Sequence, residues 1–264
     1  MDVGVLVKAA LDVNVLRSDP TGRVAVENIP LVISEYDRNA IYEAVKIRDN
    51  TGGGKVYVYS VLTWGPMERK LKDFENVIRE ALALGGDEAY VVADRSINYS
   101  EPRYTARVLE YLIRSKGNPK LVLTGEASTD MTSATLSPYL AARLGYNIVS
   151  FAKKIEVGNG YLTVLRDADD RLERVRVSLP AIVSVTGEIN SPRLPTLIQI
   201  RRAFRKPLEK YSLADIGLKP FLSRYEGYQV VTIKRKNIFI EEDSLEKAAD
   251  KLIDYLVEEG VVKI

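Results

Sequence analysis

Residues 121–145 read LVLTGEASTDMTSATLSPYLAARLG and contain the unit from which the fold is predicted. The apolar run Leu121–Thr124 is short enough for a buried strand, and the loop Gly125–Thr135 that follows it consists of small and polar residues. Beyond the loop, leucines at positions 136, 140 and 144 fall on one helical face, and Gly145 ends the helix. The stretch therefore predicts a strand, a loop and a helix in immediate succession.

The same succession occurs upstream. Strands are predicted at residues 3–7, 55–62 and 88–92, and each is followed by a helical pattern. The first helix begins after Ser34, the second has its apolar face within Phe74–Leu82, and the third has its apolar face within Tyr104–Leu112. Alternation of this kind predicts an α/β fold, with a mostly parallel, doubly wound sheet and helices on both faces.

The pattern changes near residue 148. Strand-like runs follow closely at residues 148–157, 161–166 and 171–177, and they either extend the same sheet or form an antiparallel flap. From residue 191 onward the chain is rich in proline and basic residues, which indicates an extended C-terminal arm, and residues 243–259 predict a terminal helix. We expect two regions, an α/β domain at residues 1–190 and a loop, arm and helix at residues 191–264.

The composition excludes several functions. With 38 basic and 36 acidic residues the formal net charge is +2, which argues against nucleic acid as a partner. The 264 residues include no cysteine and no histidine, so thiolate catalysis, a Ser-His-Asp triad and the usual zinc or iron–sulfur sites are excluded, and no metal site is predicted. Redox chemistry would need an organic cofactor. No signal peptide pattern is present and no run approaches the ~20 apolar residues of a membrane span, so we expect a cytoplasmic protein without direct membrane insertion.

A ligand site is predicted at one edge of the sheet, because open parallel sheets bind ligands at the carboxyl ends of strands where the strand order reverses. Lys8–Asp12, Thr63–Pro66 and Gly125–Thr135 all follow strands in this way. The last is the best candidate, since N–H groups at the start of the next helix can hold a phosphate. An ordinary loop with an Asp or Thr helix cap is the other interpretation. Trp64, the only tryptophan, is either a core aromatic or a surface on which a ligand ring stacks.

Residues 165–210 carry the most specific motif. An acidic turn at Arg166–Asp169 leads through alternating strand residues and the buried run Ala181–Val185 to a basic helix that ends at Lys206. The segment contains no nucleophile–base pair, which indicates a surface presented to another protein. The motif consists, in chain order, of Leu172, Glu173, Arg176, Leu179, Pro180, Ala181, Asn190, Pro192, Arg193, Thr196 and Leu197. This order and spacing resemble the beta subunit of electron transfer flavoprotein, in both its housekeeping and its bifurcating form, and the similarity runs through most of the chain.

The resemblance implies a sheet of the adenine nucleotide alpha hydrolase-like type and an electron carrier rather than a stand-alone enzyme. It implies a heterodimer with an alpha subunit that holds most of a shared FAD. Electrons would arrive from a dehydrogenase or NADH and leave to a quinone reductase or another acceptor. No catalytic residue is predicted on this chain. The residues implied to bind nucleotide are Leu6, Lys8, Asp12, Ser34, Glu35, Tyr36, Asp37, Trp64, Gly125, Glu126, Ala127, Ser128, Thr129, Asp130, Met131, Thr132, Ser133, Ala134, Thr135 and Leu136.

Several of these positions depart from the family's pattern. Glu126-Ala127 stands where most members have Lys-Gln, Ser34-Glu35 stands where many have Asn-Pro, and Thr135 replaces the usual Gln. Ala134 and Pro138 are closer to the bifurcating branch. The nucleotide in the predicted crevice is therefore expected to be either AMP or the adenine end of a second FAD.

The resemblance also implies a docking surface for a protein partner. Leu197 lies in the family's recognition loop and is the predicted anchor, because apolar groups inside a charged rim are typical interface hot spots. Asp167 takes the place of an acidic residue that touches the mobile flavin domain of the alpha subunit. The other interpretation of this region is an amphipathic helix with a solvated basic face. The residues implied to bind partners are Asp167, Arg193, Leu194, Thr196, Leu197, Arg201, Arg202, Arg205 and Lys206, and the arm at residues 218–240 is expected to wrap a partner subunit.

Two other functions fit the strand pattern. One is a non-redox module that binds AMP or ATP as a structural or sensing ligand, since a fold does not fix a function. The other is an enzyme of the adenine nucleotide hydrolase or ligase type, which the lack of a Walker-type motif and of histidine disfavours. The motif at residues 190–206 and the C-terminal arm favour the electron carrier, because a stand-alone module needs neither.

Overall fold

A computed structural model describes residues 1–64, 68–94, 96–97, 101–220, 227–231 and 235–263. Met1–Gln229 forms one compact unit and Val230–Ile264 a second. The expected division into an α/β domain at residues 1–190 and a loop, arm and helix at residues 191–264 stays a prediction.

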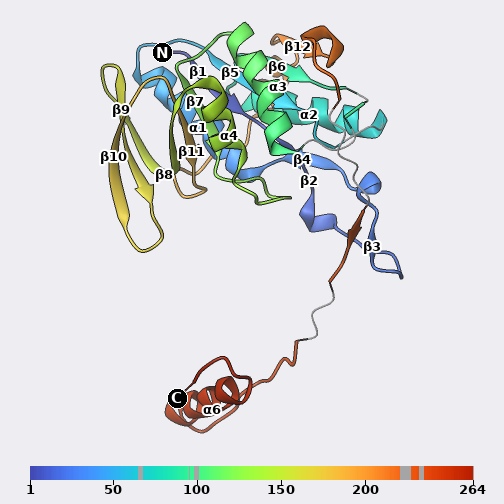
Figure 1. The fold of residues 1–264 in the computed structure, drawn as a ribbon, viewed down its shortest axis with the longest axis vertical. Helices are drawn as coiled ribbons and strands as arrows, with labels where there is room; N and C mark the ends of the chain where they lie inside the picture. The colour runs from blue at the N-terminus through green and yellow to red at the C-terminus, as the bar shows by residue number, and fades with distance from the viewer. Residues whose placement is uncertain (65–67, 95, 98–100, 221–226, 232–234, 264) are drawn as a thin grey trace. The chain divides into compact units, whose positions relative to one another are not determined.

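The first unit is built around a large sheet (Figure 1). Its nine strands run in the order β10 (Leu172–Ser178), β9 (Tyr161–Asp167), β8 (Asn147–Val157), β11 (Ala181–Val185), β7 (Leu121–Gly125), β1 (Val3–Leu6), β5 (Val56–Val61), β6 (Glu88–Val92) and β12 (Leu208–Tyr211). Neighbours from β8 to β12 in this order pair in parallel. The central strands β1, β5, β7 and β11 are buried throughout, as expected for short apolar runs covered on both faces.

Helices cover both faces of this sheet (Figure 1). They are α1 (Glu35–Asn50) and α2 (Glu68–Leu84) on one face, and α3 (Pro102–Ser115) and α4 (Leu136–Leu144) on the other. The side chains of a strand alternate between the two cores, so that in β7 Val122 belongs to the α3 and α4 side and Leu123 to the α1 and α2 side. The predicted α/β fold with a doubly wound, mostly parallel sheet is confirmed.

The strands after residue 146 extend the sheet at one edge. β8 pairs in parallel with β11, and β9 and β10 continue from it in antiparallel order. Extension of the same sheet, one of the two alternatives open from the sequence, is therefore what occurs. At the opposite edge, β12 pairs with β6, so the segment after residue 190 also contributes a strand.

The strand order reverses next to β1. The chain runs outward from β1 to β5 and β6, and it then returns to place β7 on the other side of β1. The carboxyl ends of β1 and β7 therefore frame the point at which such a sheet binds ligands. Short elements accompany this sheet. β2 (Ala9–Leu11) pairs with β4 (Leu31–Ile33), and β3 (Arg23–Val24) pairs with β13 (Tyr228–Gln229). Single-turn helices occur at η1 (Val13–Val15), η2 (Val26–Asn28) and, after the edge strand β12, η3 (Ala214–Ile216).

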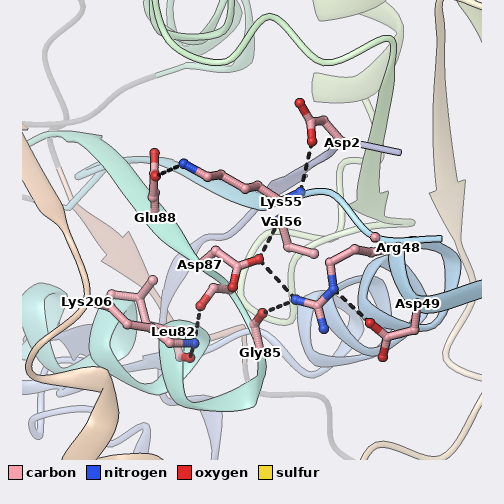
Figure 2. Close-up of polar contacts among 12 residues, drawn as sticks. Asp2, Arg48, Asp49, Lys55, Val56, Leu82, Gly85, Asp87, Glu88 and Lys206 are labelled. Atoms are coloured by element: carbon pink, nitrogen blue, oxygen red, sulfur yellow. Dashed lines mark hydrogen bonds and ion pairs between the residues drawn. The ribbon is translucent and has the colours of Figure 1, made fainter. Parts of the chain in front are cut away.

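A polar network closes the amino ends of β5 and β6 (Figure 2). Asp87 Oδ2 accepts hydrogen bonds from Val56 N at 2.8 Å and from Arg48 Nη1 at 3.0 Å. Beside this pair, Lys55 contacts the carboxylate of Glu88 at 2.5 Å. These contacts lie at the opposite end of the strands from the predicted ligand site, so they stabilise the sheet without shaping that site.

The second unit contains α6 (Leu245–Glu258), and the terminal helix predicted from the sequence is confirmed. The Ser244 hydroxyl caps it by accepting a hydrogen bond from Lys247 N at 3.3 Å. Its apolar side chains Leu245, Leu252, Ile253 and Val257 are exposed. Residues 221–226 and 232–234 of the predicted arm lie outside the described residues. Among the described helices, none is long and apolar enough to cross a membrane.

Candidate functional site

A cleft of about 160 Å³ opens at the carboxyl ends of β1 and β7, where the strand order reverses. The predicted cofactor-binding residues that line it are Leu6, Lys8, Asp37, Gly125, Glu126, Ala127, Ser128, Met131, Ser133, Ala134, Thr135 and Leu136. Thr63, from the candidate segment Thr63–Pro66, also lines it. Lining residues that the sequence did not single out come from β5 and α3, and they include Tyr59, Ser60, Val61, Pro102, Thr105 and Leu109. Segments that are distant in the sequence thus meet at the predicted edge.

Asp37 joins the two strand ends that frame the cleft. Its buried carboxylate accepts a hydrogen bond from Lys8 N at 2.7 Å, just beyond β1, and a second from the backbone of Gly125 at the end of β7. Burial raises the pKa of Asp37 to about 7, although these two backbone N–H groups act in the opposite direction. A Cβ atom on Gly125 would lie 2.7 Å from both Asp37 Oδ1 and Tyr36 Cβ. Any larger residue would therefore push α1 away from β7.

Lys8 and Asp130 form an ion pair at the cleft. Lys8 Nζ lies 2.7 Å from Asp130 Oδ1, and the side chain of Asp130 is only 2% exposed. The second carboxylate oxygen accepts hydrogen bonds from Trp64 Nε1 at 2.8 Å and from Leu11 N at 3.1 Å. Burial opposes ionisation of Asp130, but the charge of Lys8 and the hydrogen bonds outweigh it and hold its pKa below the ordinary value. Asp130 is therefore a fixed anion that neutralises Lys8.

Trp64 is buried, and its indole N–H is directed at Asp130. The centre of its ring lies 6.1 Å from that of Tyr228 and 5.9 Å from Lys8 Nζ. Trp64 is not among the described residues that line the cleft. It supports the carboxylate that holds Lys8, and its predicted stacking on a ligand ring stays a prediction.

The start of α4 lies in the lining of the cleft. Thr135 is the N-cap residue, but its side chain makes no capping hydrogen bond within the described part of the chain. Thr132 and Ala134 precede it with φ angles of 47° and 51°, a left-handed conformation that is uncommon outside glycine. In the cleft itself, the buried Thr63 hydroxyl has no hydrogen-bond partner among the described residues. Buried polar groups are nearly always paired, so this lining fits a ligand with polar groups, such as a nucleotide.

Some predicted cofactor-binding residues lie outside the cleft lining: Asp12, Ser34, Glu35, Tyr36, Trp64, Thr129, Asp130 and Thr132. Asp12 caps η1 by accepting a hydrogen bond from Asn14 N at 3.0 Å. Ser34 is fully buried at the start of α1, and its hydroxyl is unpaired within the described residues. Glu35 is exposed, and the ring of Tyr36 borders Gly187. These positions surround the cleft without forming its wall.

Negative charge gathers at one side of the cleft. Burial raises the pKa of Glu126, and the nearby carboxylates of Glu188 and Asp167 add to this shift. Lys153 Nζ lies 2.7 Å from Asp167 and 2.8 Å from Glu188, and it compensates part of this charge. Because Lys8 is already paired with Asp130, no described residue of the lining offers an unpaired cation to a phosphate. Backbone N–H groups and hydroxyls are the donors that remain.

The predicted docking surface lies on and before α5 (Leu197–Ala203). Leu194 and Leu197 are 78% and 81% exposed. Thr196 begins the helix with a capping box, in which its N–H donates to Gln199 Oε1 at 2.8 Å and its hydroxyl accepts from Gln199 N at 3.3 Å. The basic residues Arg193, Arg201, Arg202 and Arg205 are also exposed. The apolar anchor and the basic side chains are thus both available at the surface, and their role in docking stays a prediction.

Lys206, which the sequence assigned to the same basic rim, has a different environment. Its ammonium group donates to Leu82 O at 2.9 Å and to Gly86 O, at the C-terminal end of α2. Burial lowers the pKa of Lys206. A lysine on a long aliphatic stem can turn inward to cap a neighbouring helix, and a pattern of basic residues cannot distinguish this from a solvated face.

Comparisons with known proteins point to one family. The sequence model of the electron transfer flavoprotein domain matches residues 21–216. An electron transfer flavoprotein subunit beta of Thermoanaerobacterium thermosaccharolyticum is 33% identical over 81% of this chain and 79% of its own length. Subunit CarD of the caffeyl-CoA reductase-Etf complex of Acetobacterium woodii is 30% identical over 83% of this chain and 81% of its own. The subunit beta of Clostridium acetobutylicum is 28% identical over 94% of this chain and 95% of its own.

Proposed function

This chain belongs to the electron transfer flavoprotein family as a beta subunit, and we propose from this premise that it pairs with an alpha subunit to carry electrons between enzymes. The alpha subunit holds most of a shared FAD, and this chain covers one side of it. The flavin supplies the redox chemistry. Electrons arrive from a dehydrogenase or from NADH and leave to a quinone reductase or another acceptor, in the cytoplasm. This chain's own part is to bind and orient the shared flavin and to dock the partner enzymes.

In this proposal a second nucleotide occupies the cleft. The observation that carries it is the cleft itself, which stands at the reversal of strand order with the unpaired Thr63 hydroxyl in its lining. N–H groups at the start of α4 and the hydroxyls of Ser133 and Thr135 would hold the phosphate, as helix N-termini do in other nucleotide sites. Lys8 shapes the loop rather than binding the phosphate, because Asp130 already pairs with it.

The proposed nucleotide is AMP or a second FAD. The Acetobacterium woodii relative belongs, by its name, to a caffeyl-CoA reductase complex. We therefore include enzymes that act on acyl-CoA thioesters among the partners, with NADH as a candidate donor. A second FAD would accompany electron bifurcation, and AMP would accompany simple electron transfer.

Docking is assigned to α5 and the loop before it. Leu197 would enter an apolar pocket of the partner enzyme, while Arg201, Arg202 and Arg205 attract acidic groups around that pocket. The exposed apolar face of α6 would be covered by the alpha subunit. The alternative of a non-redox nucleotide-binding module is not favoured, because membership of the family accounts for the docking motif as well as for the cleft.

Flavin content tests the proposal. The chain is purified alone and after co-expression with its alpha subunit, and bound flavin is quantified by absorbance. We expect the shared FAD only in the pair, where NADH or an acyl-CoA-oxidising enzyme reduces it, and on the chain alone at most the nucleotide of the cleft. A pair that contains no reducible flavin, or a pair that contains no more flavin than the chain alone, would contradict the proposal.

A further inference from the structure

The docking helix α5 does not hold itself in place. It has seven residues, and only Ala203 is buried. Isolated helices of this length are unstable in water, because most helical stability in proteins comes from a buried apolar face. Its capping box joins Thr196 to Gln199 and so stays within the helix. Something outside α5 must therefore fix its orientation on the first unit.

Arg79 of α2 supplies one such contact. Its Nη1 atom donates to Ala203 O at 2.9 Å and to Lys206 O at 3.0 Å, at the C-terminal end of α5. Its guanidinium carbon also lies 5.8 Å from the centre of the Phe204 ring, within the range of a cation–π contact. A cation at this end of a helix pairs with carbonyl groups that lack partners inside the helix.

Lys206 supplies the reverse contact. It comes from the turn after α5, and its ammonium group donates to Leu82 O at 2.9 Å and to Gly86 O, at the C-terminal end of α2. Arg79 of α2 thus caps the C-terminal end of α5, and Lys206 caps the C-terminal end of α2 in return. Figure 2 shows Lys206 beside the Arg48–Asp87 pair, and Asp87 in turn is bonded to Val56 N at the start of β5. The turn after α5 therefore lies next to the amino end of the sheet.

We propose that Arg79 and Lys206 are positioning residues that clamp α5 to α2 and so hold Leu197 and Ile198 in one fixed orientation for docking. This rests on the proposed function of α5 as a docking surface. The clamp acts on orientation and not on cofactor binding, because it lies at the amino end of the strands whereas the cleft lies at their carboxyl ends. Its loss would raise the KM for the partner enzyme and leave kcat unchanged, since the loosened helix must be ordered again on each encounter.

A spin label tests the clamp directly. The chain has no cysteine, so the variant Ile198→Cys gives a single attachment site on α5 for a nitroxide. In the heterodimer, the label should be ordered in the parent and mobile after Arg79→Gln, and likewise after Lys206→Met. Arg79→Lys, which keeps a cation, should restore part of the order. Arg174→Gln, at an exposed arginine of β10, is the matched control and should change nothing. Unchanged mobility in Arg79→Gln and Lys206→Met would overturn the clamp.

A transfer assay tests the consequence, with the caffeyl-CoA reductase of Acetobacterium woodii as the partner probe and unlabelled variants. Arg79→Gln should raise the KM for the probe about tenfold at constant kcat, the range typical of a contact that contributes to a hot spot. A mobile label with an unchanged KM would overturn the positioning role. Failure of Leu197→Ala to raise the KM would instead refute docking through α5, while the label result would still decide whether the clamp exists. The two failures are therefore distinguishable.

Discussion

The cleft and the docking helix are held in opposite ways. At the cleft, buried carboxylates hold the structure together. Asp37 accepts hydrogen bonds from the ends of β1 and β7. Asp130 pairs with Lys8 and accepts hydrogen bonds from Trp64 and from a backbone N–H. At α5, one alanine is buried, and two long cations fix the helix end from outside. The proposed ligand site is therefore part of the core, whereas the proposed docking helix has little buried surface of its own.

The largest effect is expected for Asp37→Ala. It leaves the N–H groups of Lys8 and Gly125 unpaired in a buried environment, so unfolding should become easier by about 3 kcal/mol. The nucleotide in the cleft should be lost as well. Urea denaturation and nucleotide extraction measure the two effects. Asp19→Ala is the matched control, because Asp19 lies in an exposed turn, where it accepts a hydrogen bond from Thr21 N at 2.8 Å, and it should cost much less stability than Asp37→Ala does. Equal losses in the two variants would contradict the role of Asp37 at the cleft.

Asp130→Asn should have the next largest effect. It removes the charge that pairs with Lys8 while keeping a side chain of the same size. We expect a loss of about 2 kcal/mol, less than for a fully buried pair because Lys8 is 23% exposed. Trp64 is the only tryptophan and bonds to this carboxylate, so its fluorescence should shift with the substitution. An unchanged emission spectrum together with unchanged stability would show that the ion pair does not organise the loop.

The protonation of Asp37 should give the cleft a pH-dependent stability. Its folded-state pKa is raised from 3.8 to about 7, so the folded protein binds a proton that the unfolded chain has released. The resulting stability is fully present below the unfolded value and is lost as the pH rises through about 7. Between those values the free energy of unfolding should fall by at most roughly 1.4 kcal/mol per pH unit relative to Asp37→Asn. If the free energy of unfolding varied with pH in the same way in the parent and in Asp37→Asn, a raised pKa of Asp37 would be contradicted.

The smallest effect on stability is expected for Leu197→Ala, because the side chain is 81% exposed. The free energy of unfolding should change by no more than about 0.5 kcal/mol. The flavin spectrum should stay the same, and the KM for the partner enzyme should rise about tenfold. Stopped-flow reduction of the heterodimer by its donor measures this. Transfer rates equal to those of the parent would remove Leu197 as the anchor.

Most of the fold was predictable from the sequence, because buried strands and amphipathic helices leave direct patterns. Leu121–Thr124 and the leucines after Gly125–Thr135 were enough to predict β7 and α4. The strand–helix succession then predicted the edge of the sheet at which the cleft lies. The short strand β12 was not predicted, since Leu208–Tyr211 carries only a weak apolar signal and is placed at the sheet by its packing against β6.

The wall of the cleft was only partly predictable. Thr105 and Leu109 line it from α3, but the helical pattern shows only that such residues face inward and not which of them reach the end of β5. The sequence also does not show in which direction a long or amphipathic side chain points. Trp64 turns its N–H toward Asp130, and Lys206 turns toward α2, because each finds a buried acceptor that lies far away in the sequence.

In the proposed heterodimer, the cleft of this chain holds its own nucleotide in addition to the shared flavin. The most direct measurement is to denature the purified heterodimer and quantify the released nucleotides by chromatography, with Gly125→Val as the variant that distorts the cleft by pushing α1 away from the end of β7. We predict one shared FAD together with one AMP or one second FAD in the parent, and the shared FAD alone in Gly125→Val. A single FAD and no other nucleotide in the parent would show that the cleft holds no nucleotide of its own.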